Sequence, residues 1–347
     1  MQVETGLMGF QGKPLMLDEV AAAARKIEEL GFDGLITAEA GGHDAFLPLV
    51  MVAASTRRIT LGTGVVIAFP RSPMVTAQEA WDLQMFSGGR FKLGLGTQVK
   101  AHNERRYSAP WTAPPGPRMR EYVLCLKAIF QTFQNPAQPP TYFKGQHYQF
   151  TLMTPFFNPG PLERSVPIYV GAVNKYLARL AGELCDGLCY HPFCTPKYMK
   201  EVLLPAVQAG ARKAGRDPSA VVIWGSPMVA AGRNKAEVEA AKGNVRMNIA
   251  FYGSTRTYFP VLEVHGLLDL GQRLYQLSLE GKWAEMMALV SDEMLEEFAI
   301  VGTYDEVVPR LQQRWSGILT SVIVSLPRET PEDERLTRAA IETLHKA

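Results

Sequence analysis

Short apolar runs alternate along the chain with segments whose apolar residues recur every three or four positions. The runs are continuously apolar, without a period of two, which is typical of strands buried on both faces of a parallel sheet. The intervening segments have the spacing of amphipathic helices, as at Val20, Ala23, Ile27 and Leu30 before Gly31. The pattern predicts eight strands, each followed by a helix, at 3–9, 32–37, 59–68, 91–96, 166–172, 187–190, 221–230 and 321–326.

Two long segments interrupt this alternation. Residues 98–165, after the fourth strand, are rich in proline and arginine, with one strong helix around 119–133 and a predicted hairpin at Lys144 and Gly145. Residues 231–317, after the seventh strand, are predicted to be mostly helical. Because the active sites of barrels lie at the C-terminal ends of the strands, we expect both insertions to wall or cover a pocket there.

Eight strand–helix units in 347 residues favour a closed (β/α)8 TIM barrel, as a single domain over 1–347. An open dinucleotide-binding sheet is disfavoured, because the first strand is followed by GFQGKP and not by a GxGxxG turn.

Composition argues against several classes of protein, namely nucleic-acid-binding, membrane-spanning and zinc-finger proteins. Lys and Arg total 36 against 34 Asp and Glu, a formal net charge of +2, so the chain has no basic footprint for nucleic acid. The chain shows neither a signal peptide nor an apolar stretch of the ~20 residues that span a membrane, and we expect a cytoplasmic protein. The four cysteines lack zinc-finger spacing, and no metal site is predicted.

Polar side chains cluster where predicted strands end. Glu39 and His43 follow the second strand, Thr97, Gln98 and His102 follow the fourth, and His191 follows the sixth. A single histidine is more often structural, but three at one barrel mouth are a stronger indication of proton chemistry. Glu39 is either a buried hydrogen-bonded acid or an acid of the site.

Two backbone features also indicate a ligand. Gly62 and Gly64 interrupt the third strand, which favours a bulge that approaches a ligand or, equally, tight packing between helix and strand. The fifth strand runs into a short turn before a helix, made by Gly171, Ala172, Val173 and Asn174. The N–H groups at such a helix start bind phosphate, unless Asn174 is simply the N-cap of an ordinary turn.

The stretch RITLGTGVVIAFPRSPMVTAQEAWDLQMFSGGRFKLGLGTQ, residues 58–98, resembles the bacterial luciferase-like flavin and deazaflavin oxidoreductases. ELGFDGLITAE, GQHYQF, VPIYVGAV and AGELCDGL extend the resemblance over nearly the whole chain. The resemblance implies a TIM barrel that binds its cofactor at the C-terminal mouth. QVKAHNERRY and EAGGHDAFLPL most resemble the subgroup that uses coenzyme F420.

The resemblance also implies roles for individual residues. Gly64 and Val65 match a bulge where the family has a non-proline cis peptide behind the cofactor ring, and Thr63, Thr97 and Gln98 line the ring. Gly171, Ala172, Val173 and Asn174 match the loop that holds the cofactor phosphate, and His191 is placed among the cofactor-binding residues. Glu39 falls where deazaflavin members carry an acid near the reactive ring edge.

Two departures from the family pattern affect the proton chemistry. Gln98 stands where many relatives have glycine, and Val99 where some dehydrogenases place a catalytic glutamate. We therefore weigh His43 first, Glu39 second and His102 third as the group that exchanges a proton.

Together these observations predict hydride transfer between coenzyme F420 and a small organic substrate, in a protein expected to form a homodimer. Arg105 or Arg106 is expected to meet the anionic cofactor tail, unless both belong to a solvated helix face. Aromatic residues of the insertions, Tyr252 and Tyr258 among them, favour a partly apolar substrate or form the insertions' own core.

Two alternatives remain, an FMN-dependent monooxygenase and a non-catalytic flavin- or deazaflavin-binding protein. An aldolase-type barrel is disfavoured, because no predicted strand ends in a lysine that would form a Schiff base.

Overall fold

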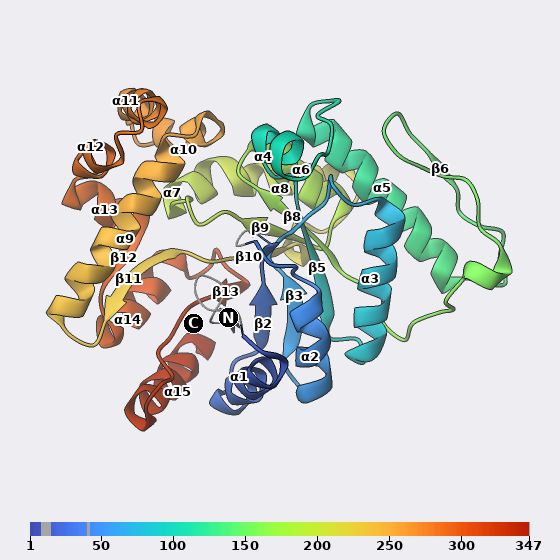
Figure 1. Cartoon of the computed structure of the whole chain (residues 1–347), viewed down its shortest axis with the longest axis horizontal. Helices are drawn as coiled ribbons and strands as arrows, with labels where there is room; N and C mark the ends of the chain where they lie inside the picture. Colours follow the sequence, from blue (N-terminus) through green and yellow to red (C-terminus); the bar gives the residue numbers. More distant parts are fainter. Residues whose placement is uncertain (8–14, 40–41, 347) are drawn as a thin grey trace.

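A computed structural model describes residues 1–7, 15–39 and 42–346. Its centre is a ring of parallel strands surrounded by helices (Figure 1). The strands of the ring are β1 (Gln2–Gly6), β2 (Gly34–Thr37), β3 (Thr60–Thr63), β4 (Val66–Ile67), β5 (Phe91–Gly96), β8 (Ile168–Ala172), β9 (Gly187–Tyr190), β10 (Val222–Gly225) and β13 (Ser321–Ile323).

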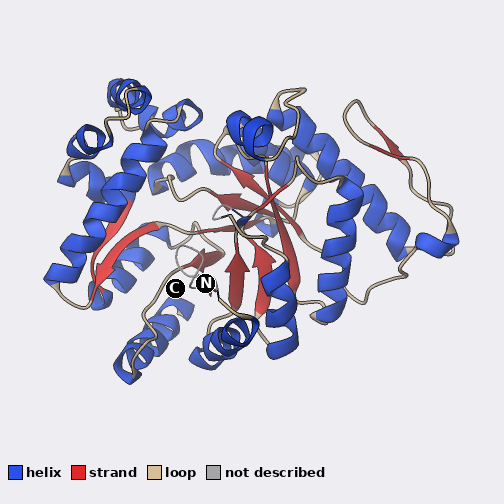
Figure 2. Ribbon diagram, viewed as in Figure 1, coloured by secondary structure: helices blue, strands red, loops and turns tan. Residues whose placement is uncertain are grey.

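Helices cover the outside of the ring, as Figure 2 shows. They are α1 (Leu17–Leu30), α2 (Leu47–Ser55), α3 (Pro73–Phe86), α5 (Pro115–Gln134), α6 (Lys175–Leu184), α7 (Pro196–Tyr198), α8 (Leu204–Lys213), α14 (Tyr304–Trp315) and α15 (Pro331–His345). A π-helical turn at Met199–Leu203 joins α7 to α8, and a 3-10 turn at Pro218–Ala220 precedes β10.

The two insertions carry the remaining elements. The first contains α4 (Lys100–Arg106), the antiparallel pair β6 (Phe143–Lys144) and β7 (Gln149–Phe150), and a 3-10 turn at Pro155–Phe157. The second contains β11 (Met228–Gly232), α9 (Lys235–Gly253), a 3-10 turn at Arg256–Tyr258, α10 (Phe259–Glu263), α11 (Leu268–Leu279), α12 (Trp283–Ala288), α13 (Asp292–Phe298) and β12 (Ala299–Thr303).

The strands pair in the order β3–β2–β1–β13–β10–β9–β8–β5, and β3 pairs with β5 to close the ring. This closure confirms the predicted (β/α)8 TIM barrel. The predicted hairpin at Lys144 is also confirmed, as the pair β6–β7. No helix in the described part of the chain is both long and apolar enough to cross a bilayer.

Local signals set several helix ends as the sequence predicts. Gly31 ends α1 with φ 98°, a left-handed conformation that glycine adopts without a steric penalty. Thr195 opens α7 with its side chain, which accepts from the Tyr198 N–H at 3.1 Å, and Pro196 follows at the first helical position.

The predicted third strand is divided into β3 and β4. A cis peptide bond joins Gly64 to Val65 between the two halves. The segment that includes and follows β2 spans the interruption, because the Gly64 N–H donates to the Thr37 carbonyl at 2.7 Å and the Glu39 N–H donates to the Val65 carbonyl at 3.1 Å. The cis peptide that the family resemblance implied is thus present at that position.

A polar network fills part of the barrel interior. The Glu4 carboxylate is completely buried and accepts from Lys92 Nζ at 2.5 Å, from Ser321 Oγ at 2.8 Å and from Trp224 Nε1 at 2.9 Å. Lys92 Nζ also lies 4.5 Å from the centre of the Trp224 ring. A buried acid is tolerated inside the ring when its oxygens are paired in this way.

The predicted end of the seventh strand was wrong, whereas residues 231–317 are mostly helical, as predicted. The predicted strand 221–230 is not one strand, because β10 ends at Gly225 and β11 leaves the ring to pair in parallel with β12. Pro227 lies at the break and has no N–H to donate to the barrel ladder, which explains why the strand does not continue. β12 itself falls within 231–317, which was predicted to be mostly helical.

Other boundaries shifted without altering the architecture. β1 ends at Gly6, and Met8 and Gly9, the last residues of the predicted first strand, lie outside the described residues. β13 ends at Ile323, three residues before the predicted end. α4 forms in the first insertion, outside the one strong helix that was predicted there.

Candidate functional site

The predicted site residues lie on one arc of the barrel rim. β2, β3–β4, β5, β8 and β9 are consecutive neighbours in the ring, and parallel strands end at the same rim. The segments at these strand ends carry Glu39 and His43, the Gly64–Val65 bulge, Thr97 and Gln98, Gly171–Asn174 and His191. The fold therefore brings together residues that lie up to 152 positions apart, from Glu39 to His191.

Val65 is the point where three of these segments meet. A Cβ on Gly96 would overlap Val65 Cγ2, and a Cβ on Gly171 would lie 3.4 Å from Val65 Cγ1. On the interior side, a Cβ on Gly64 would lie 3.0 Å from Trp224 Cη2. The glycines therefore set how closely the bulge approaches β5 and β8, and the indole of Trp224 supports it from inside the barrel.

Thr63 faces the barrel wall. It is fully buried, and its Oγ1 donates to the Gly94 carbonyl and accepts from the Gly94 N–H, both at 2.9 Å. These bonds fasten β3 to β5 beneath the bulge.

Thr97 and Gln98 form the turn that leads from β5 into α4. Gln98 has φ 52°, in the left-handed region that favours glycine. Its Oε1 accepts from the Val99 N–H at 2.9 Å. Fully buried Asn103 donates from Nδ2 to the Thr97 carbonyl at 3.0 Å and so fixes the turn from the α4 side.

The loop before α6 combines an N-cap with two open main-chain amides. Asn174 is the N-cap, because its Oδ1 accepts from the Leu177 N–H at 3.1 Å. No acceptor among the described residues binds the amides of Lys175 and Tyr176, so both are available to an anion. Tyr198 steadies the loop by donating from its hydroxyl to the Val173 carbonyl at 2.7 Å.

Glu39 is a buried, hydrogen-bonded acid. Its side chain accepts from the Ile67 N–H at 2.6 Å and from Arg71 Nη1 at 2.7 and 2.9 Å. Arg71 Nη2 donates to Asp44 Oδ2 at 2.8 Å. Burial alone lowers the pKa of Arg71, but the hydrogen bond and charge of Glu39 raise it above its usual value. The carboxylate therefore holds β4 against the segment that follows β2.

His43 and His102 have exposed side chains, as do Arg105 and Arg106 on the same α4 helix as His102. The Arg106 guanidinium lies 5.1 Å from the centre of the Tyr107 ring, and its Nη2 lies 3.8 Å from the position of a Cβ on Gly42. α4 thus approaches the segment that carries His43.

His191 is half-buried among aromatic rings. Its Nδ1 accepts from the Phe193 N–H at 3.0 Å, and its ring centre lies 4.5 Å from that of Tyr252 and 4.7 Å from that of Tyr258. Burial lowers the pKa of His191 to about 4. The imidazole is therefore neutral near pH 7, with its proton on Nε2 because Nδ1 is an acceptor.

Arg71, Asn103 and Phe193 had no role in the sequence analysis, although each fixes a residue that did. Arg71 lies 32 positions from Glu39. Asn103 and Phe193 act on main-chain and ring atoms six and two positions away.

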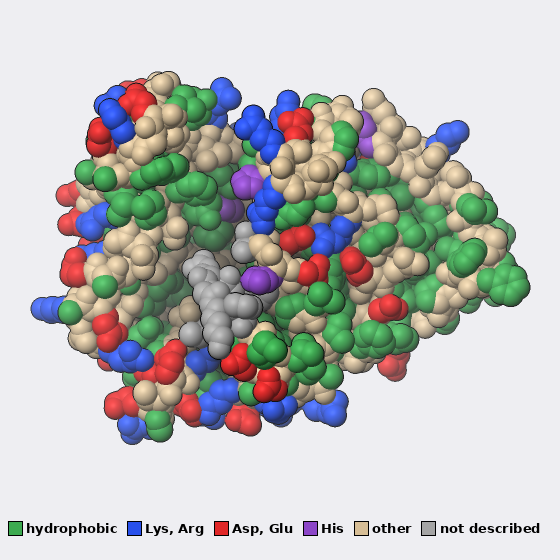
Figure 3. Space-filling model, viewed as in Figure 1, with side chains coloured by type: hydrophobic (Ala, Val, Ile, Leu, Met, Phe, Trp, Pro, Cys, Tyr) green, Lys and Arg blue, Asp and Glu red, His purple; other side chains and the backbone are tan. Residues whose placement is uncertain are grey.

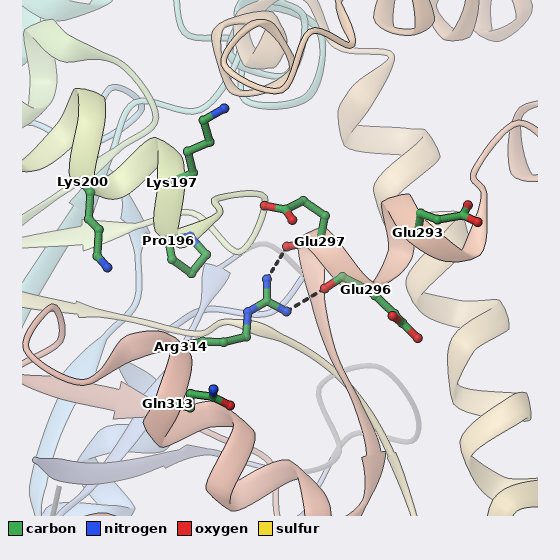
Figure 4. Close-up of a pocket in the computed structure, with 8 residues that line it drawn as sticks. All are labelled: Pro196, Lys197, Lys200, Glu293, Glu296, Glu297, Gln313 and Arg314. Carbon is green, nitrogen blue, oxygen red and sulfur yellow. Dashed lines mark hydrogen bonds between the residues drawn. The ribbon is translucent and has the colours of Figure 1, made fainter.

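Two cavities bounded by described residues lie away from this arc. One, of about 780 Å³, opens at the N-terminal end of the barrel beside Lys92 and Tyr169. The other, of about 670 Å³, opens between α7 and α13–α14 (Figure 4). Figure 4 shows Arg314 spanning the second cavity, where it donates to the carbonyls of Glu296, at 2.6 Å, and Glu297. This cationic side chain thus joins α14 to the C-terminal end of α13.

On the face shown in Figure 3, histidine side chains lie near a central hollow, with acidic and basic side chains beside them and along the left and lower edges. Within residues 1–7, 15–39 and 42–346, no group of three or more histidine, cysteine or carboxylate side chains is placed to hold a metal ion.

A family model described as luciferase-like monooxygenase matches residues 4–320. The chain belongs to the luciferase-like monooxygenase family. The luciferase-like chain is 43% identical over 311 residues to an uncharacterized protein of Mycobacterium tuberculosis, with 89% of this chain and 90% of the other covered. It is 33% identical over 310 residues to a 5,10-methylenetetrahydromethanopterin reductase of Archaeoglobus fulgidus, with 86% and 87% covered.

The luciferase-like barrel also matches a solved structure, the coenzyme F420-dependent tetrahydromethanopterin reductase of Methanopyrus kandleri. The TM-score is 0.76 at 20% sequence identity, and the match covers 99% of this chain and 98% of the other. At this level of identity the likeness shows the fold.

Proposed function

We propose that this protein transfers a hydride between coenzyme F420 and a small organic substrate. The observation that carries the proposal is the rim arc, where the Gly64–Val65 bulge lies two strands from a helix start with open amides. The names of the similar proteins support it, because they describe a methylenetetrahydromethanopterin reductase and an F420-dependent reductase.

The residues of the arc fit a flat ring with a phosphorylated tail. The loop at Gly171–Asn174 begins against the bulge, because a Cβ on Gly171 would lie 3.4 Å from Val65 Cγ1, and it runs on to the start of α6. This path suits a polyol chain between a ring on the bulge and a phosphate on the amides of Lys175 and Tyr176. When bound, the deazaflavin supplies a ring carbon that exchanges hydride with a substrate.

The protein's own residues then divide the remaining tasks. The bulge positions the ring, Thr97 and Gln98 border it, and Arg105 or Arg106 meets the anionic tail. His43 exchanges a proton with the substrate, with His102 as the second candidate. The occupied oxygens of Glu39 favour a positioning role, in which the acid holds β4 and thereby the bulge.

An FMN-dependent monooxygenase is the alternative, because the matching family model is described as a luciferase-like monooxygenase and the same rim fits a flavin ring. A non-catalytic cofactor-binding protein is the second alternative. For such a protein, His43→Ala and His102→Ala would leave the cofactor affinity unchanged. No donor would reduce the bound cofactor.

Titration of the apoprotein with each cofactor tests the proposal. We expect coenzyme F420 to bind saturably, followed through its own fluorescence, and FMN to bind at least tenfold more weakly. Tight FMN binding without F420 binding would overturn the F420 assignment and favour the monooxygenase.

A further inference from the structure

The side chain of His191 is directed toward the barrel mouth. β9 pairs with β8 so that Tyr190 lies opposite Ala172, and His191 therefore continues the rim beside Val173. Cys189 packs in the barrel interior with Trp224, whereas Tyr190 packs outward on Trp315. Because side chains alternate along a strand, His191 lies on the same side as Cys189, just above the interior.

The imidazole of His191 presents one defined donor. Nδ1 is occupied by the Phe193 N–H, and no described residue accepts a hydrogen bond from Nε2. Burial is the cause of the lowered pKa of the ring, and it also raises the pKa of the hydroxyls of Tyr252 and Tyr258. His191 and both tyrosines are therefore uncharged donors near neutral pH.

The second insertion is fastened to the segment after β9. Thr195 Oγ1 lies 2.8 Å from His265 Nε2, and the ring of Phe193 stacks on that of Phe298 with their centres 4.8 Å apart. Lys197 Nζ donates to the Val264 carbonyl at 2.5 Å. The aromatic wall formed by Tyr252 and Tyr258 is thus held in place beside His191 by contacts at several points.

We propose that His191 donates a hydrogen bond from Nε2 to an oxygen atom of the substrate, at a site bordered by Tyr252 and Tyr258. The proposal rests on the proposed function, because it places the substrate at the same rim as the cofactor. It assigns substrate recognition to the residue that the family resemblance placed with the cofactor.

This environment selects the chemical class of the substrate. The aromatic faces of Tyr252 and Tyr258 favour a flat or alicyclic apolar body, and a neutral donor suits a carbonyl or hydroxyl oxygen. A charged group would lose its hydration here without a charged partner among the described neighbours of His191. We therefore assign a neutral, ring-bearing ketone or the corresponding secondary alcohol.

The hydrogen bond also suits the chemistry in the reducing direction. The carbonyl carbon accepts the hydride from the reduced cofactor, the C=O π pair moves onto oxygen, and that oxygen takes a proton delivered from solvent through His43. The ketone is reduced to an alcohol and the cofactor is oxidised. The Nε2–H bond strengthens as negative charge develops on the oxygen, which stabilises the transition state.

Nuclear magnetic resonance of the full-length protein with ¹⁵N-labelled histidine tests the proposal. The probes are acetophenone and ethylbenzene, which have similar shapes but differ in the carbonyl oxygen. We expect the His191 signals to show an Nε2–H tautomer that stays neutral down to about pH 5. We also expect acetophenone, and not ethylbenzene, to shift the Nε2 resonance.

Three variants complete the experiment. His191→Phe is expected to weaken acetophenone binding about tenfold, as expected for a lost hydrogen bond, while ethylbenzene binding changes little. His191→Asn retains a donor and is expected to recover most of the affinity. His147→Asn, in the β6–β7 turn, is the matched control and leaves both affinities unchanged.

The outcomes separate this proposal from the proposed function. If coenzyme F420 binds but both probes shift His191 equally, the assignment to His191 is overturned and the cofactor assignment stands. If acetophenone shifts His191 selectively while coenzyme F420 fails to bind, the assignment to His191 stands and the cofactor assignment fails. A cationic or Nδ1–H imidazole at pH 7 would also overturn the role of His191.

Discussion

Arg71 Nη1 lies 2.7 and 2.9 Å from the two carboxylate oxygens of Glu39. The side chains of both residues are largely buried, at 17% and 8% exposure, so Arg71→Met leaves a buried acid without its cation. We expect a loss of about 3 kcal/mol in the free energy of unfolding, measured by urea denaturation. The control Arg335→Met, at a side chain that is 78% exposed, is expected to change it by less than about 0.5 kcal/mol. Equal effects of the two changes would contradict the role of Arg71.

Gly96→Ala tests whether the position of the bulge governs cofactor binding. The new methyl group would overlap Val65 Cγ2 and displace the bulge from β5. We expect coenzyme F420 to bind at least tenfold more weakly and the free energy of unfolding to fall by about 1–3 kcal/mol. Gly243→Ala is the matched control, because a Cβ there meets nothing within 4 Å and alanine is preferred in a helix. Unchanged affinity in Gly96→Ala would mean that the bulge does not contact the ring.

Because Glu4 and Lys92 form an ion pair inside the barrel, we expect the effects of mutating them on the free energy of unfolding not to add. Glu4→Gln leaves Lys92 charged inside the barrel, and we expect it to lower the free energy of unfolding by about 3–5 kcal/mol. Adding Lys92→Met removes that charge, so the double variant is expected to be more stable than Glu4→Gln alone. Denaturation curves of the four proteins measure this difference. Losses that simply add would show that the two charges are independently solvated.

The ion pairs of Glu183 make the free energy of unfolding depend on pH. The hydrogen bond from Arg120, with further support from Lys213, lowers the pKa of Glu183 from 4.5 to about 2. The carboxylate therefore stabilises the folded protein fully above about pH 4.5, and this contribution disappears as the pH falls through about 2. We expect Glu183→Gln to be about 1–2 kcal/mol less stable at pH 7, with the difference shrinking below pH 4.5. Glu332→Gln, at an exposed acid, serves as the control and should show no such narrowing.

The barrel was predictable because its signals are local and repeated. Each continuous apolar run needs two covered faces, and only a parallel ring with helices outside provides them for all the strands. The bulge at the glycines of the third strand and the helix cap at Asn174 were predictable for the same reason, since each is set by residues within a few positions. The bounds of β5 match the prediction to the residue.

What the sequence did not show depends on contacts between distant segments. Glu39 could not be assigned between a buried hydrogen-bonded acid and an acid of the site, because Arg71 is separated from it by a whole strand–helix unit. β12 was hidden because its partner β11 lies about 70 positions earlier, and a five-residue strand leaves a weak pattern among helices. Tyr252 and Tyr258 were ambiguous between pocket and insertion core, and only the folded chain shows them against His191.

The parallel pairing of β11 with β12 gives the second insertion a common base. The chain leaves the ring after β10, and both ends of the α9–α13 excursion are fixed side by side in that pair before the return through α14 to β13. Helices α9–α13 can consequently vary in length or identity without shifting the register of any strand in the ring. Ligand preference can therefore change through replacement of α9–α13, while the residues at the rim of the ring keep their positions.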